Sequence, residues 1–166
     1  MSQSMIGGST SYENQSIQDI TEDIKKWIGL TEEIKIIIIK NKSIVEKTDF
    51  WDRVGTNFKI TISETIKYLD EFLSDFNLLN RSLQKGKITK KEVNTLKSIG
   101  ERSIEFNKKY SSTFNRDGAE WRDYGNKNFR YIEEIFIEGI DYFATLEDAS
   151  NAADRLLEFI WKLNFN

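Results

Sequence analysis

The chain has 166 residues, with 24 basic and 27 acidic side chains, a net charge of −3 and a hydrophobic fraction of 39%. It contains no cysteine, histidine or proline, which excludes disulfides, thiolate and imidazole metal ligands, and nucleophilic triads that depend on histidine. The absence of proline suits long helices, because proline breaks helix interiors. Because few of the residue types that usually carry catalysis remain, we expect a protein without enzymatic activity and without a cofactor.

Residues 1–13 contain two glycines, several Ser and Thr and few apolar side chains, which predicts a flexible tail. We expect residues 14–166 to form a single domain. No basic start is followed by an apolar run, so no signal peptide is expected. The longest aliphatic run, Ile36 to Ile39, is too short for a membrane span. A cytoplasmic protein is therefore expected, and the abundance of Ile and Asn suggests a bacterial or phage source.

Two helices are predicted in the first part of the chain. The first begins at Asn14 and has helical apolar spacing at Ile17, Ile20, Ile24, Trp27 and Ile28. Gly29 suits its C-terminal cap and Thr31 suits the N-cap of a second helix that ends near Lys47. The isoleucine run of this second helix also has strand propensity. Because no partner strand exists, we expect a helix buried on most of its circumference.

The longest amphipathic stretch runs from Asp49 to Lys85. Its apolar residues recur about every 3.6 positions, the period of one helix face, at Trp51, Val54, Phe58, Ile62, Ile66, Leu69, Leu73, Phe76, Leu79 and Leu83. Gly55 weakens the first turns by roughly 1 kcal/mol, so a later start or a bend there is left open. Gly86 suits the C-terminal cap.

The next helix has a capping box at Thr89 and Glu92. The short loop before it predicts an antiparallel hairpin over residues 49–115. Gly100 and Ser103 are small enough to let a neighbouring backbone come close.

The rest of the chain predicts a turn at residues 115–118, an irregular stretch over residues 119–128, and two helices divided near Thr145. The expected fold is therefore an all-α antiparallel bundle of five to six helices organised on the hairpin.

Charge is concentrated in blocks. Residues 13–33 and 133–158 are rich in acids, and residues 81–102 are rich in bases. Four lysines, Lys85, Lys87, Lys90 and Lys91, surround the hairpin loop and are called the lysine turn below. They are a candidate contact for phosphate or nucleic acid, or they solvate the helix ends. The blocks also suggest electrostatic fit between neighbouring helices.

Arginines and aromatic residues alternate over residues 116–131. Trp, Tyr and Arg are enriched at binding hot spots, so this segment is a candidate protein-binding surface. Its residues are Arg116, Trp121, Arg122, Tyr124 and Arg130. Stacking of bases on Trp121 or Tyr124 is the nucleic-acid alternative, and packing at the end of the bundle is the structural one.

Glu138 and Asp141 lie one helical turn apart, with Glu134 one turn earlier, a spacing that suits Mg²⁺. This Glu-x-x-Asp element resembles that of the all-α nucleoside triphosphate pyrophosphohydrolases. The resemblance implies a magnesium-dependent phosphohydrolase. Those enzymes also need a Glu-x-x-Glu pair on an earlier helix, which this chain lacks; Glu101 and Glu105 are the nearest substitute.

The sequence favours a non-enzymatic helical interaction module, an accessory or adaptor subunit that binds another protein or a second copy of itself. Its long apolar stripes, including the isoleucine run, can exceed what one chain buries. A nucleic-acid-binding protein that uses residues 81–97 and 116–131, and the phosphohydrolase, are the alternatives.

Overall fold

The computed structural model describes the backbone of residues 5–53, 55–124 and 126–165. Side chains are described for residues 17–49, 51–52, 55–114 and 130–162. The described backbone forms helices and no strand, which confirms the all-α class. The helices are α1 (Met5–Glu46), α2 (Asp49–Arg53), α3 (Thr56–Gln84), α4 (Lys90–Tyr124), α5 (Asn126–Leu146) and α6 (Asp148–Phe165).

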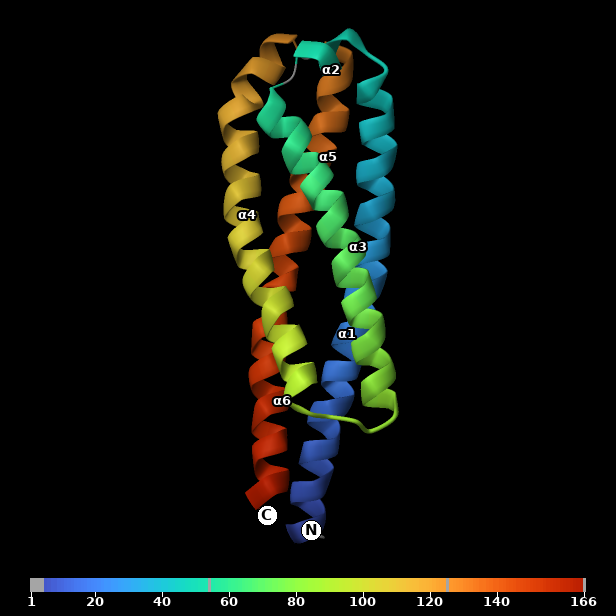
Figure 1. The fold of residues 1–166 in the computed structure, drawn as a ribbon, viewed down its shortest axis with the longest axis vertical. Helices are drawn as coiled ribbons and strands as arrows, with labels where there is room; N and C mark the ends of the chain where they lie inside the picture. Colours follow the sequence, from blue (N-terminus) through green and yellow to red (C-terminus); the bar gives the residue numbers. More distant parts are fainter. Residues whose placement is uncertain (1–4, 54, 125, 166) are drawn as a thin grey trace.

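The helices pack side by side as antiparallel rods (Figure 1). Helices α1, α3 and α4 are separate rods, and α5 and α6 follow one another along a further one. Helix α1 packs against α3 and α5, and α4 packs against α3, α5 and α6. The two ends of the chain lie at the same end of the bundle, and the single turn α2 lies at the opposite end (Figure 1).

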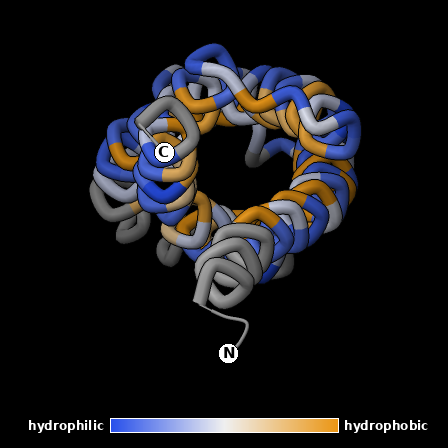
Figure 2. The backbone as a smooth tube through the Cα atoms, turned by 90° about the horizontal axis from the view of Figure 1, so that it is seen from below, coloured by the Kyte–Doolittle hydropathy of each residue, from blue (hydrophilic) through white to orange (hydrophobic). Residues whose placement is uncertain are grey.

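The core is apolar and rich in aromatic residues. The view along the bundle in Figure 2 shows hydrophobic positions on the inner side of the ring of helices. The largest fully buried aromatic side chains are Phe58, Phe72, Phe76, Tyr110, Phe114 and Phe143. Their rings make tilted and edge-to-face contacts, such as Phe58 on Phe114 at 5.5 Å between centroids, which favour a defined packing.

Helices α3 and α4 form the predicted antiparallel hairpin. Along the hairpin, residue numbers rise on α3 as those of the facing residues fall on α4. The facing pairs are Phe58 with Phe114, Thr61 with Thr113, Glu64 with Lys109, Tyr68 with Phe106, and Glu71 and Asp75 with Arg102. This constant register extends over most of α3, so the hairpin is a continuous interface.

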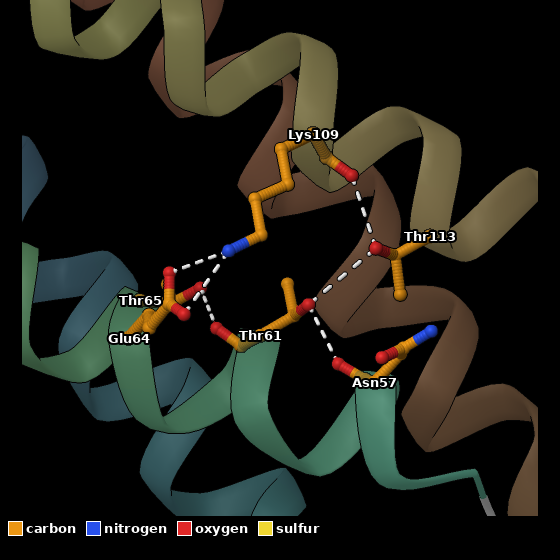
Figure 3. Close-up of polar contacts among 6 residues, drawn as sticks. All are labelled: Asn57, Thr61, Glu64, Thr65, Lys109 and Thr113. Carbon is orange, nitrogen blue, oxygen red and sulfur yellow. Dashed lines mark hydrogen bonds and ion pairs between the residues drawn. The ribbon is translucent and has the colours of Figure 1, made fainter.

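Three buried threonines of the hairpin bond to their own helices (Figure 3). Thr61 and Thr65 donate to the carbonyls of Asn57 and Thr61, at 2.7 and 2.6 Å. Thr113 donates to the carbonyl of Lys109 at 3.0 Å. Because each hydroxyl proton is bound four residues back along the helix, these threonines have a structural role.

The first two predicted helices are one helix. Helix α1 continues through Gly29 and Thr31, so the predicted caps at these residues are wrong. The buried hydroxyl of Thr31 donates to the carbonyl of Trp27 at 2.6 Å instead of starting a helix. Helix α1 also begins at Met5, so residues 5–13 are helical although a flexible tail was predicted; residues 1–4 lie outside the described backbone.

The predicted helix over residues 49–85 is interrupted. Helix α2 ends at Arg53, and Gly55 is the N-cap of α3 with an extended ψ of 152°. The later start that Gly55 left open is therefore what the structure has, and the first turn of the predicted rod is the separate helix α2.

The loop between α3 and α4 agrees with its sequence signals. Gly86 has a φ of 73°, and the amides of Gly86 and Lys87 bond to the carbonyls of Leu83 and Ser82, which is the Schellman ending. The Glu92 carboxylate accepts bonds from the amide and hydroxyl of Thr89 at 2.7 and 2.6 Å. The predicted capping box is therefore confirmed.

The second half of the chain is more regular than predicted. Helix α4 continues to Tyr124, so the predicted turn at residues 115–118 is wrong, and residues 119–124 are helical. Residue 125 lies outside the described backbone. Thr145 belongs to α5, which ends at Leu146. The predicted close approach at Gly100 is made by α6, because a Cβ added there would lie 2.6 Å from the Ser150 amide nitrogen.

Candidate interaction surface

The predicted arginine and aromatic segment lies mainly on the last turns of α4. The side chains of Arg116, Trp121, Arg122 and Tyr124 are outside the described residues. Arg130, on α5, is exposed, and its guanidinium lies 4.7 Å from the ring centroid of its neighbour Tyr131. The binding role of this segment stays a prediction.

The lysine turn is brought together at one end of the hairpin. Lys85 caps α3, Lys87 lies in the loop, and Lys90 and Lys91 form the first turn of α4. All four are exposed, and none forms an ion pair within the described part of the chain. The predicted nucleic-acid contact stays a prediction.

The described ion pairs between helices do not join the predicted acidic blocks to the predicted basic block. Arg102 bonds to Glu71 and Asp75 of α3, at 3.1 and 3.2 Å. Arg155, within the acidic block, pairs with Asp23 of α1 at 3.2 Å. Among the described residues, the acids of residues 133–158 form no ion pair with the bases of residues 81–102.

Glu134, Glu138 and Asp141 all lie on the exposed side of α5. Over the described ranges, no group of three or more acidic side chains is placed so that it could hold a metal ion. The phosphohydrolase alternative, which depends on a magnesium site, stays a prediction.

The isoleucine run of α1 exposes apolar surface to solvent. Ile34 and Ile38 are buried, whereas Ile36 is 68% and Ile39 is 44% exposed. The prediction that this stretch is buried on most of its circumference is wrong. Consecutive residues of a helix point about 100° apart, and the outer face of α1 has no covering helix among the described elements.

Ile36 and Ile39 line an open groove between α1 and α3, called the α1–α3 groove below. It has a volume of about 510 Å³ and is lined by Glu32, Lys35, Ile36, Ile39, Lys40 and Leu73. Lys35 bridges the two helices through an ion pair with Asp70 at 2.5 Å. An apolar centre with a charged rim is the usual anatomy of a protein interface.

A second, smaller groove lies between α1 and α5. It has a volume of about 100 Å³ and is lined by Leu30, Glu33, Ile34, Ile37, Glu138, Asp141, Tyr142 and Thr145. The Tyr142 hydroxyl lies 2.8 Å from that of Thr31. Because the Thr31 proton is bound to Trp27, Tyr142 is the donor. Burial raises the pKa of Tyr142 well above its ordinary value, so this hydroxyl is a neutral structural group.

Sequence reasoning identified the isoleucine run as surplus apolar surface but not the grooves beside it. The charged residues at positions 32, 33, 35 and 40, which interrupt the apolar pattern of α1, were the available signal. Within the described residues, no helix has both the length and the hydrophobicity needed to cross a membrane. No protein-family model, no curated protein and no solved structure matches this chain.

Proposed function

We propose that this chain is a non-enzymatic helical interaction module, an accessory or adaptor subunit that binds another protein through the outer face of α1. The observation that carries the proposal is the exposure of Ile36 and Ile39 beside Leu73 in the α1–α3 groove. A partner helix that presents apolar residues at helical spacing would cover these side chains.

Burial of the exposed isoleucines by a partner would be energetically favourable. Burying a large aliphatic side chain stabilises an association by about 1.5–3 kcal/mol relative to leaving it exposed. Ile36 and Ile39 lie one turn apart on a rigid helix, and Lys35, which lines the same groove, is held by Asp70. The helical backbone that carries these side chains is therefore ordered before binding, which lowers the conformational entropy lost when a partner docks.

The double variant I36E/I39E tests this proposal. We expect it to fold. Each substitution should change the free energy of unfolding by no more than about 0.5 kcal/mol, because both side chains are exposed. We expect it to lose the partner, because charge in the apolar centre of an interface is costly. The measurement is a pull-down of tagged protein from the native host, with sedimentation velocity to detect self-association.

The matched control is I60E/L78E, which adds the same charge to two residues of α3 that are 46% and 53% exposed and do not line the groove. The control is expected to retain every protein, or self-associated species, that the wild type retains. The proposal would be contradicted if the two double variants retained partner proteins equally. It would also be contradicted if the wild type were a strict monomer that retains no protein.

A further inference from the structure

The groove between α1 and α5 combines an apolar floor with an acidic rim, and is called the acid-rimmed groove below. Ile34 and Tyr142, at its floor, are only 4% and 5% exposed. Glu33 from α1 and Glu138 and Asp141 from α5 are exposed at its rim. Its volume of about 100 Å³ suits a single long side chain rather than a whole helix.

The three rim carboxylates have no internal counter-charge. None of them forms an ion pair or hydrogen bond within the described residues. Lys26 and Lys40, also exposed on α1, each lie about two turns from Glu33 along the helix and do not line the groove. The groove therefore presents negative charge over an apolar surface, which complements a cation on an aliphatic stem and disfavours an acidic group.

We infer that the acid-rimmed groove receives a lysine or arginine side chain from a basic segment of the protein partner. The aliphatic stem would lie on Ile37 and Tyr142, and the cation would reach Glu138 and Asp141, since long basic side chains bury their stems and keep their charge in water. This inference rests on the proposed function and adds the chemistry of the partner to it. A metal ion is not the occupant that the geometry favours, because the described acids do not converge on one point.

The test uses a fluorescein-labelled amphipathic peptide built of leucine and lysine, and a counterpart with glutamate in place of each lysine. Binding is measured by fluorescence anisotropy at low salt, because exposed charge pairs are screened at high salt. The variant is E138Q/D141N, which removes two rim charges at nearly constant shape. We expect its affinity for the lysine peptide to be weaker by roughly tenfold, which is about two exposed ion pairs.

The matched control is E101Q/E105Q, which changes the net charge equally at two exposed positions of α4 that form no ion pair. It should weaken the affinity for the lysine peptide by less than about twofold, and the glutamate peptide should not bind any variant. Equal weakening by both variants would show attraction to the net charge alone and overturn the inference, as would a lysine peptide that does not bind the wild type.

The failure of this inference is distinguishable from that of the proposed function. Retention of the native partner depends on Ile36 and Ile39 in the α1–α3 groove, and affinity for the lysine peptide depends on Glu138 and Asp141. If E138Q/D141N binds the lysine peptide as the wild type does, the inference fails while the I36E/I39E result stands.

Discussion

Replacing Gly139 by alanine should destabilise the protein by roughly 3 kcal/mol, the upper end of the usual range for overpacking a core site. A Cβ at this position would lie 2.5 Å from both the Cε1 atom and the hydroxyl oxygen of Tyr110. No real side chain makes such a contact, so α5 or the ring must move. Urea denaturation at neutral pH gives the change in the free energy of unfolding.

Tyr110 cannot easily move away. Its ring is fully buried and packs against Phe106, Phe114 and Phe143, with centroid distances of 5.8, 4.6 and 5.7 Å. Its hydroxyl donates to the carbonyl of Ile135 at 3.0 Å. A shift of the ring would break this bond and leave a buried polar group unpaired, which itself costs about 1–3 kcal/mol.

Gly29→Ala is the matched control, with an expected effect of the opposite sign. Gly29 lies inside α1, and a Cβ there would meet no atom within 4 Å. Because alanine is favoured over glycine in a helix interior, this variant should gain up to about 1 kcal/mol. A Gly139→Ala protein as stable as the wild type would contradict the close packing of α4 on α5.

Stability should also fall steeply above pH 10, because Tyr110 and Tyr142 are held neutral in the folded protein. Burial raises the pKa of both hydroxyls well above the ordinary value of 10.0. In the unfolded chain both groups lose their protons near pH 10, whereas the folded protein keeps them. The folded state then binds more protons, so the stability present below pH 10 is lost as the pH rises.

The expected slope is about 1.4 kcal/mol per pH unit for each tyrosine. Urea denaturation between pH 8 and about pH 11.5 measures this slope. Tyr142→Phe should lose about 1 kcal/mol of stability at neutral pH, because the bond to Thr31 is removed. Its loss of stability above pH 10 should be less steep by about 1.4 kcal/mol per pH unit, the contribution of one tyrosine. Lysine titration is common to both proteins and cancels in the comparison. The same slope in the wild type and the variant would show that Tyr142 is not held neutral by the fold.

The sequence predicts the hairpin because its signals agree over many residues. A single apolar stripe specifies α3, and the loop has a glycine at positive φ followed by a capping box. Such agreement between local and long-range signals is what defines a structure.

The predictions at Gly29 and Thr31 are wrong because local stop signals are small in energy. A helix-interior glycine costs about 1 kcal/mol, which is less than the burial of the apolar residues on either side of it. Trp27 and Ile34 are both buried, so a continuous α1 keeps both in the core. Gly86 does end a helix, because its φ of 73° lies outside the range of a continuing helix, and Gly55 is the extended N-cap of α3.

The candidate surface could be predicted only in part. Four consecutive isoleucines cover the whole circumference of a helix, so the sequence cannot say which of them face the core. That is decided by where α3 and α5 pack, which leaves Ile38 buried and Ile36 exposed. The acid-rimmed groove combines Glu33 with Glu138 and Asp141, residues far apart in the chain that only the antiparallel packing of α1 and α5 brings together.

The most direct measurement of the central claim is site-specific photo-crosslinking from the outer face of α1. Because the chain has no cysteine, Ile36→Cys provides a unique attachment point for a benzophenone label, and Leu78→Cys provides one on an exposed site of α3. If the outer face of α1 binds a partner, the label at residue 36 should give a discrete adduct in the native host and the label at residue 78 should not. The same adducts from both sites, or none from residue 36, would contradict the account.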